Sequence, residues 1–191
     1  LDRSSAASDV YKRQGSTGGD TRPFTTAVLN GDVDNHADLA AAETLQLPAE
    51  VTTDAKVIPV LWSRRLAEGQ DSEVAFRNAV APMEGSVAIA ANSAARPGEL
   101  MLALRGSGQA LYVGLADDAF VIASEPYGGI EETASYVRMD GETPSDPANA
   151  NATRGQIVRL DASAAGSLAG ITRWGYDGTE LPVAEGDVVS G

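Results

Sequence analysis

The chain has 191 residues, 43% of them hydrophobic, a length and composition that suit one domain with a sizeable core. Its 27 acidic and 14 basic side chains give a formal net charge of −13, and because such a field repels phosphate groups we expect no nucleic acid and no membrane as partner. The absence of cysteine and the single histidine exclude a disulfide framework, a Cys-based zinc site and a cysteine nucleophile within these residues.

The two ends of the chain differ in character from its middle. Residues 1–14 are polar and aperiodic and lead into the Gly/Ser/Thr-rich GSTGGDT, so we interpret residues 1–20 as a leader, either non-native or disordered. Residues 21–183 are expected to form the domain, and residues 184–191 to begin a linker to a further domain. Because no apolar run approaches the roughly 18 residues of a membrane helix and no secretion signal is evident, we expect a cytoplasmic protein.

The first predicted element is a buried strand over residues 24–29 (FTTAVL), a run that is β-branched and apolar. It stops at Asn30-Gly31, a pair typical of tight hairpin turns. The residues that follow have the pattern of a helix with Asn35 as its N-cap, so a hairpin does not fit. The apolar face predicted for this helix consists of Ala37, Ala41 and Leu45.

Two more helices are predicted downstream. Thr53 or Asp54 can cap the first of them, which has apolar side chains at spacing four. These side chains form the rows Val57/Leu61 and Ile58/Trp62/Leu66. Pro59 lies inside this helix, where we expect it to cost a backbone hydrogen bond and to bend the first turns. The third helix is predicted within residues 72–83.

From Gly85 onward the chain is a run of short apolar strands. The strand segments are SVAIAANS, ELMLALRG, QALYVGL, AFVIAS, SYVRMD, GQIVRLD and LAGITRW, with a brief helix expected in PYGGIEET (126–133). Several segments are apolar on both faces, which indicates sheets covered on both sides and an α+β layered domain. The Gly-rich RGSGQ at 105–109 is predicted to be a hairpin turn and not a phosphate cradle, because a strand follows it.

Two positions stand out as candidate site residues. A side-chain amide beside an unencumbered glycine N–H, as at Asn30-Gly31, is what an oxyanion hole requires, although the same pair also suits a plain strand-to-helix turn. Asp54 at a helix start could pair with a substrate ammonium, or serve only as a cap. We expect His36 and the Asp117-Asp118 pair to be exposed to solvent, and we predict no metal site.

Several segments, in order along the chain, resemble the glutaminase domain of the class II glutamine amidotransferases, as in glucosamine-6-phosphate synthase (glutamine–fructose-6-phosphate aminotransferase). AVLNGDVDNHADL at 27–39 is similar to the family's strand, Asn-Gly and Glu-Asn-His segment, and TTDAKVI at 52–58 to its Thr-Asp-Thr-Glu-Val-Ile segment. EGSVAIA, LALRGSGQALYVGL and FVIASEP follow in the family's order, so that the resemblance covers residues 24–183.

The resemblance implies an α+β fold, the N-terminal-nucleophile hydrolase four-layer αββα sandwich of two antiparallel sheets, here incomplete at the N-terminus. It assigns the side-chain amide of Asn30 and the N–H of Gly31 to the oxyanion hole, and Asp54 to the α-ammonium of glutamine. In such enzymes an N-terminal cysteine attacks the glutamine amide, and the released ammonia passes to a sugar isomerase domain of the same protein. The resemblance implies no cofactor, and any homo-oligomer would form through the isomerase domain.

The chain departs from the family at the reacting groups. It has no cysteine, and no segment matches the HTRWATHG-type motif that grips the substrate carboxylate. Lys56 and Pro59 also stand where the family has Glu and a small residue. We therefore interpret residues 21–183 as a partial amidotransferase domain, inactive as it stands, whose parent supplies ammonia for making glucosamine 6-phosphate from fructose 6-phosphate. The alternative is a non-catalytic binding or regulatory module that kept the fold and lost the nucleophile.

Overall fold

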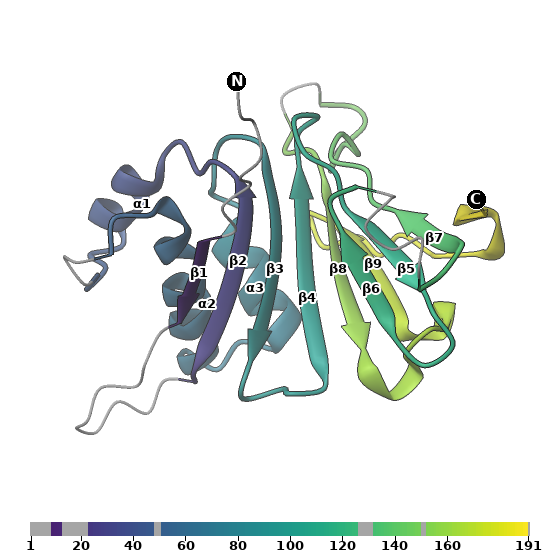
Figure 1. The fold of residues 1–191 in the computed structure, drawn as a ribbon. Coiled ribbons are helices and arrows are strands. Elements are labelled where there is room, and N and C mark those ends of the chain that lie inside the picture. The colour runs from purple at the N-terminus through teal and green to yellow at the C-terminus, as the bar shows by residue number, and fades with distance from the viewer. Residues whose placement is uncertain (1–8, 13–22, 48–50, 126–131, 150–151, 191) are drawn as a thin grey trace, which may run out of the picture.

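Two antiparallel sheets lie face to face in the computed structural model of the chain, and helices cover one of them (Figure 1). The structure describes residues 9–12, 23–47, 51–125, 132–149 and 152–190. The first sheet has the strand order β1-β2-β3-β4-β8-β9, and the second has the order β10-β7-β5-β6. The predicted α+β architecture of two antiparallel sheets is therefore confirmed.

The strands agree well with the apolar segments of the sequence. Those of the first sheet are β1 (Asp9–Lys12), β2 (Thr25–Gly31), β3 (Val87–Ser93), β4 (Glu99–Arg105), β8 (Gln156–Asp161) and β9 (Ile171–Gly175). Those of the second are β5 (Tyr112–Leu115), β6 (Phe120–Ala123), β7 (Ser135–Arg138) and β10 (Val188–Ser190). β1 falls within residues 1–20, which we interpret as a leader, and pairs with β2. β10 falls within residues 184–191, which we expect to begin a linker, and pairs with β7. The brief helix expected at 126–133 lies largely outside the described residues.

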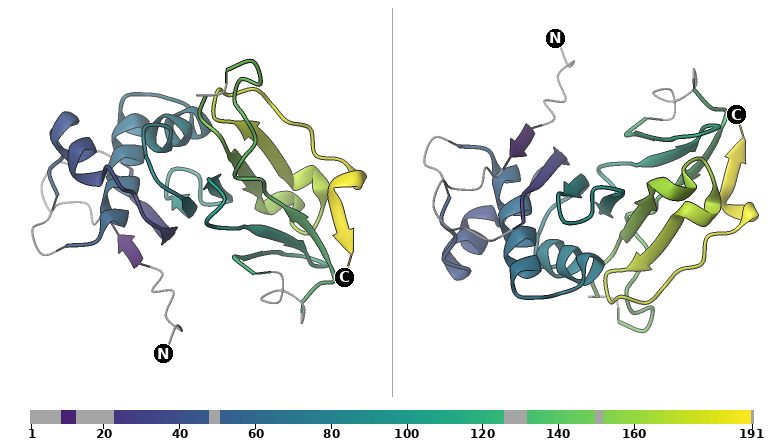
Figure 2. Two further views of the ribbon diagram at one scale, coloured as in Figure 1. Left: turned by 90° about the horizontal axis from the view of Figure 1, so that it is seen from above. Right: turned by 90° about the horizontal axis from the view of Figure 1, so that it is seen from below.

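The helices pack on one face of the first sheet (Figure 2). They are α1 (His36–Ala42), the short 3₁₀ helix η1 (Asp54–Lys56), α2 (Val57–Ala67) and α3 (Ser72–Val80). The predicted rows of α2 are buried except for Leu66, which is partly buried. Trp62 meets Phe76 of α3 edge to face, with ring centroids 5.2 Å apart. In the part of the chain that the structure describes, no helix is long and apolar enough to cross a bilayer.

A second apolar layer fills the space between the two sheets. Along β4, Met101 and Ala103 belong to the helix-side core, whereas Leu102 and Leu104 pack against the second sheet, as the period of two along a strand requires. This double coverage explains why β4 is a continuous apolar run. Within the described residues the α-helices all lie on the first sheet, so the layers seen are helix, sheet and sheet.

The hairpin predicted at residues 105–109 is wrong. β4 pairs with β3 and β8, whereas β5 pairs with β6 and β7, so RGSGQ carries the chain from the first sheet to the second. A strand-turn-strand pattern cannot distinguish a hairpin from such a crossing. Leu111 and Val113 are buried in the apolar layer between the two sheets, and this burial favours the crossing over a hairpin.

Two details of the helices also differ from expectation. The buried residue of α1 is Leu39, and the predicted face was wrong because Ala37 and Ala41 are exposed. The helix has seven residues, so the inward direction is set by where it docks and not by its own apolar pattern. Pro59 lies in the first turn of α2, which begins at Val57, and a missing N–H costs little there.

Candidate functional site

The Asn30-Gly31 pair forms the end of β2, opposite Ala88 and Val87 of β3. Gly31 has a φ of +109°, and a Cβ built on it would lie 2.1 Å from the carbonyl oxygen of Ser86. Only glycine fits a backbone with this conformation and this contact. The pair therefore ends a strand and leads into a helix, as the sequence predicted, and does not form a hairpin.

The segment after Gly31 is fixed against the loop that precedes β3. The N–H of Asp34 donates to the carbonyl oxygen of Glu84 at 3.0 Å. The side chain of Asn35 accepts from the N–H of Glu84 and donates to the carbonyl oxygen of Pro82, both at 2.9 Å. Asn35 does occupy the N-cap position of α1, but the predicted side-chain cap is wrong, because the loop takes both of its polar atoms. These contacts hold the backbone beside Gly31 in one arrangement.

Asp54 lies next to this segment although it is far away in the sequence. Its Oδ2 accepts the N–H of Val33 at 2.6 Å, across 21 positions of the chain. Thr53 supplies the helix cap, since its hydroxyl accepts the N–H of Ala55 at 3.2 Å. The Asp54 carboxylate is thus not needed as a cap, and it is half-buried in η1, which leads into α2. The structure brings Asp54 and the end of β2 into one site.

The side chain of Asn30 faces the side of the first sheet away from the helices. Ala27 and Leu29 of the same strand belong to the helix-side core, and the alternation along β2 turns Asn30 the other way. Its amide is half-buried and forms no hydrogen bond with another described residue. The two predicted parts of the site therefore approach Gly31 differently, Asp54 from the helix layer and Asn30 from the face of the first sheet away from the helices.

Two residues that the sequence analysis did not single out support the same region. The hydroxyl of Ser86 accepts the N–H of Gly108 at 3.0 Å and lies 3.3 Å from the carbonyl oxygen of Arg105. The guanidinium of Arg105 donates to the carbonyl oxygens of Ala81, at 3.3 Å, and Met83. The crossing at 105–109 is thereby tied to the loop that holds Gly31. The sequence signal for this contact was the Gly-rich RGSGQ, which we had interpreted as a turn.

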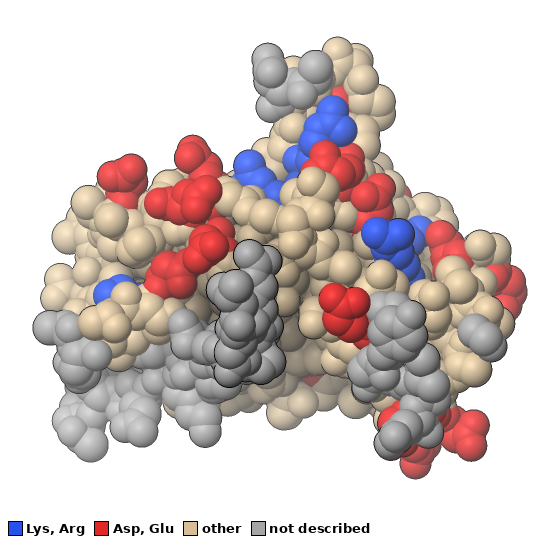
Figure 3. All heavy atoms as spheres, turned by 45° about the horizontal axis from the view of Figure 1, so that its top comes forward, with Lys and Arg blue, Asp and Glu red and all other residues tan. Residues whose placement is uncertain are grey.

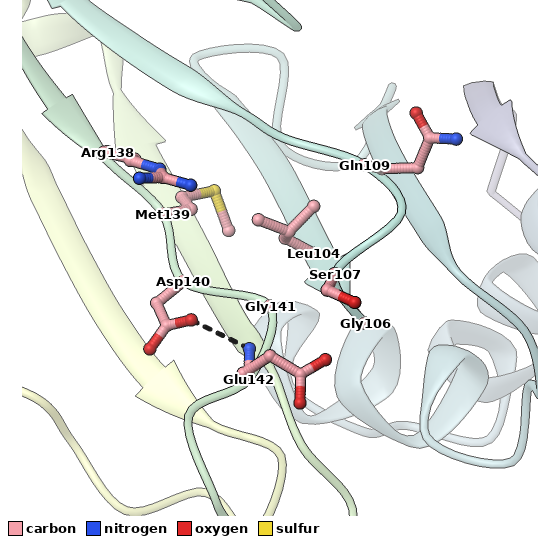
Figure 4. Close-up of a pocket in the computed structure, with 9 residues that line it drawn as sticks. All are labelled: Leu104, Gly106, Ser107, Gln109, Arg138, Met139, Asp140, Gly141 and Glu142. Atoms are coloured by element: carbon pink, nitrogen blue, oxygen red, sulfur yellow. Dashed lines mark hydrogen bonds between the residues drawn. The ribbon is translucent and has the colours of Figure 1, made fainter.

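A pocket of about 240 Å³ opens where the crossing at 105–109 meets the turn after β7 (Figure 4). Its lining residues are Leu104, Gly106, Ser107, Gln109, Arg138, Met139, Asp140, Gly141 and Glu142. The turn is held by Asp140, whose carboxylate accepts the N–H of Glu142 at 2.9 Å, and the N–H of Gly106 donates to the carbonyl oxygen of Gly141 at 2.9 Å. Gln109 points away from the other lining side chains (Figure 4), and its Cγ lies 3.3 Å from the Cβ position of Gly31.

The surface around the site is acidic. Asp and Glu side chains are spread over both halves of the face shown in Figure 3, with Lys and Arg mostly between those of the right half. Asp32, Asp34 and Glu84, all exposed, flank the end of β2. This field favours a cationic group on a ligand and disfavours an additional negative charge.

The other polar candidates do not join this site. His36 is half-exposed, and its Nδ1 lies 3.0 Å from the carbonyl oxygen of Val33 in its own turn. Asp117 and Asp118 are exposed. Among the described residues, no three His, Asp or Glu side chains gather in a way that could hold a metal ion. Burial raises the pKa of the Tyr176 hydroxyl far above its usual range, and the positive charge of Arg105 lowers it in part.

Comparison with known proteins gives relatives over part of the chain, whereas no family model matches it. The chain is 31% identical over 116 residues, 59% of its length, to the glutamine–fructose-6-phosphate aminotransferase (isomerizing) of Methanothermobacter thermautotrophicus. It is 32% identical over 115 residues, 60% of its length, to the protein of the same name from Bacillus thuringiensis. The chain spans 19% of the length of each of these two relatives.

Solved structures show the same fold. The glutamine phosphoribosylpyrophosphate amidotransferase of B. subtilis matches with a TM-score of 0.61 and 17% identity, over 87% of this chain and 31% of that one. An allosteric regulatory enzyme of purine biosynthesis matches with a TM-score of 0.59 and 16% identity, over 87% of this chain and 30% of that one. At these identities the likeness concerns the fold alone. Together the comparisons confirm the resemblance to amidotransferase glutaminase domains inferred from the sequence.

Proposed function

We propose that this chain is the glutamine-binding part of a glutamine-hydrolysing amidotransferase whose parent supplies ammonia for converting fructose 6-phosphate to glucosamine 6-phosphate. One observation carries the proposal: the Val33 N–H lies 2.6 Å from Asp54 Oδ2, so a carboxylate stands beside the Asn30-Gly31 strand end. The names of the relatives support the choice of acceptor. In this proposal a sugar isomerase domain of the same polypeptide receives the ammonia, any homo-oligomer forms through that domain, and the enzyme works in the cytoplasm.

Each site residue has a distinct part in the proposed reaction. The contact with Val33 orients the carboxylate of Asp54, whose other oxygen binds the α-ammonium of glutamine. The thiol of an N-terminal cysteine outside these residues gives its proton to the α-amino group of the same cysteine and attacks the amide carbon of the substrate, and the charge moves to the amide oxygen. Asn30 and Gly31 donate hydrogen bonds to that oxygen. Collapse of the intermediate expels ammonia, which carries the transferred proton, and water then hydrolyses the thioester to glutamate.

The 191 residues contain no cysteine, so the proposal predicts that they do not hydrolyse glutamine by themselves. The test is to incubate the purified chain with L-glutamine and to measure ammonia with a coupled glutamate dehydrogenase assay. Release at the rate of a buffer control is expected. Release above that rate would refute the assignment of the nucleophile to a residue outside this sequence.

The role of Asn30 can be tested in the longer parent protein. Asn30→Ala should lower glutamine hydrolysis by about 100- to 1000-fold, the usual effect of removing one oxyanion donor. Folding stability should change little, because the Asn30 amide has no hydrogen-bond partner among the described residues. Asn78→Ala on the exposed side of α3, where the side chain donates to Gln70 at 2.9 Å, is the matched control and should leave turnover unchanged. An Asn30 variant with normal turnover would remove this residue from the mechanism.

The lack of cysteine favours a second candidate function, an amidotransferase-like module that binds glutamine without hydrolysing it. The two candidates differ in the coding sequence that precedes Phe24 in the natural gene. An initiating Met-Cys followed by an Arg-Trp-containing segment supports the enzyme. An intact start without cysteine supports the binding module.

A further inference from the structure

We propose that a second small-molecule site lies between the two sheets, away from the Asn30-Gly31 strand end, and that it binds an uncharged ligand with a compact apolar body and one hydroxyl group. The inference is carried by a pocket of about 230 Å³. One of its lining residues, Asn92, is five positions along β3 from Val87, the partner of Gly31, which is roughly 16 Å in a strand. The inference goes beyond the proposed function and does not depend on it.

The floor of this pocket is a row of three neighbouring side chains on the first sheet. Leu100 of β4 pairs with Asn92 of β3 on one side and with Leu160 of β8 on the other. Leu100 and Leu160 belong to the apolar layer between the sheets, so the row faces the second sheet. The opposite wall consists of Phe120 and Ile122 of β6, the strand at one edge of the second sheet. The pocket is therefore a gap in the apolar layer where the two sheets face each other.

The walls of the pocket are held by contacts between the ends of strands. The N–H of Ala162, just after β8, donates to the carbonyl oxygen of Gly98, just before β4, at 2.9 Å. A Cβ on Gly170 would lie 2.7 Å from Cζ of Phe120, so the phenyl ring packs directly on the backbone of the short 3₁₀ helix η4 (Leu168–Gly170). The pocket is thus formed before any ligand arrives, as most small-molecule sites are.

Asn92 is the polar group of the floor. Its Nδ2 donates to the carbonyl oxygen of Glu99 at 2.8 Å, and because a carbonyl only accepts, this bond fixes which way the amide is turned. The Oδ1 of Asn92 forms no hydrogen bond with another described residue. The side chain is half-buried beside Leu100, where an acceptor without a partner is unfavourable. A ligand that donates one hydrogen bond to Oδ1 would remove this cost.

The charge and the size of the pocket define the ligand class. The carboxylate of Glu99, the charged residue in the lining, is already paired with Arg96 at 3.6 Å, so the pocket does not require an ion. The net charge of −13 further disfavours an anionic ligand. An apolar cavity of about 150 Å³ is enough for benzene. The larger volume of this pocket suits a phenyl-sized body that carries a hydroxyl group, and benzyl alcohol has these properties.

The experiment is an NMR titration of the ¹⁵N,¹³C-labelled 191-residue chain with benzyl alcohol and, separately, with anisole, its isomer without an O–H group. Benzyl alcohol should shift the side-chain signals of Asn92, Ile122 and Leu160. It should bind about fivefold more tightly than anisole, the effect of one net hydrogen bond. Asn92→Leu should make the two affinities equal, because leucine cannot accept. The control Asn78→Leu, at an exposed position of α3, should keep the preference for benzyl alcohol.

A variant that fills the pocket tests where the ligands bind. Ile122→Trp should abolish the binding of both, because the indole occupies the space of the ligand body. Should Ile122→Trp not fold, Ala165→Phe in the lining should have the same effect. Binding that survives in the folded variant would place the ligands elsewhere and would overturn the proposal.

Three results in the unaltered chain would also overturn it. If neither compound shifts the signals of the lining residues, the pocket is not a binding site. If anisole binds as tightly as benzyl alcohol, Oδ1 of Asn92 accepts no hydrogen bond from the ligand. If benzylamine binds more tightly than benzyl alcohol, the site selects a cation through Glu99 and not an uncharged hydroxyl compound.

Discussion

Replacing Gly31 with alanine tests the geometry on which the candidate site depends. The residue has a φ of +109°, and the new Cβ would lie 2.1 Å from the carbonyl oxygen of Ser86. That oxygen also accepts the N–H of Asp32 at 3.3 Å, so the end of β2 cannot move away without loss of this bond. The substitution adds a methyl group at a position where the backbone conformation is unfavourable for any side chain and where the packing leaves no room for one.

The expected loss of unfolding free energy has two parts. The left-handed backbone costs an alanine about 1–2 kcal/mol. To relieve the contact with Ser86, the ends of β2 and β3 must separate, which breaks the hydrogen bond from the Asp32 N–H and costs about 1 kcal/mol. The cost is larger if the neighbouring hydrogen bonds between β2 and β3 also weaken. We expect about 3 kcal/mol in total, a large part of the roughly 5–15 kcal/mol that stabilises a typical domain.

The assay is urea denaturation followed by tryptophan fluorescence, which reports on the two buried tryptophans, Trp62 and Trp174. Gly69→Ala is the matched control, because Gly69 has a φ of +84° but no atom within 4 Å of its Cβ position. It should lose only the backbone contribution, about 1 kcal/mol. The difference between the two variants isolates the contact of Gly31 with Ser86.

Equal losses in the two variants would refute the reasoning. They would mean that the end of β2 has room for a side chain, and that the close approach of Gly31 to Ser86 does not exist in solution. The oxyanion role proposed for the Gly31 N–H would then lose its geometric basis. A loss at Gly31 that exceeds the loss at Gly69 by about 2 kcal/mol supports it.

Three further outcomes follow from the described contacts. Asp54→Asn keeps an oxygen for the same backbone N–H, so stability should change by less than about 1 kcal/mol in urea denaturation, whereas glutamine binding measured by NMR should fall at least about tenfold with the loss of the charge. Arg105→Met removes donors from two backbone carbonyls of the neighbouring loop and should cost about 2 kcal/mol; a loss below about 0.5 kcal/mol would contradict the contact. A hydrogen bond from the Ala184 N–H, with the nearby Arg173 guanidinium, holds the pKa of Asp187 below its usual 3.8. Because the folded state favours the charged form of Asp187, this residue contributes stability above pH 3.8, and that contribution is lost as the pH falls through the lowered pKa. Asp187→Asn should remove this contribution from the pH dependence of the unfolding free energy, measured by denaturation curves between about pH 2 and 6.

The sequence predicted most elements whose signal is local. The α2 rows repeat every four residues, and a helix converts that spacing into one buried side, so Ile58 and Trp62 were assigned to the core correctly. Asn30-Gly31 was assigned to a strand end because a helical pattern followed it. The buried face of α1 was predicted wrongly, since a helix of seven residues is oriented by its docking and not by its own pattern.

Local sequence patterns did not determine the geometry of the candidate site. From the sequence, Asp54 could be a helix cap or a substrate-binding residue. In the structure Thr53 caps the helix, and the Asp54 carboxylate accepts the N–H of Val33 in the segment after Gly31. The RGSGQ crossing had the pattern of a hairpin, because a strand-turn-strand sequence does not say which sheet receives the second strand. The burial of the apolar side chains that follow RGSGQ places the next strand in the second sheet.

The sequence by itself determined the α+β layered class, the acidic composition and the end of a buried strand at Asn30-Gly31. These properties depend on composition, on periods of two and four residues and on backbone sterics, all of which are written within a few neighbouring positions. Only the tertiary structure decided that the carboxylate of Asp54 meets Val33 across 21 residues and that Gln109 lies beside Gly31. Such contacts join segments whose local patterns are independent, and the shared burial of their strands and helices is what brings them together.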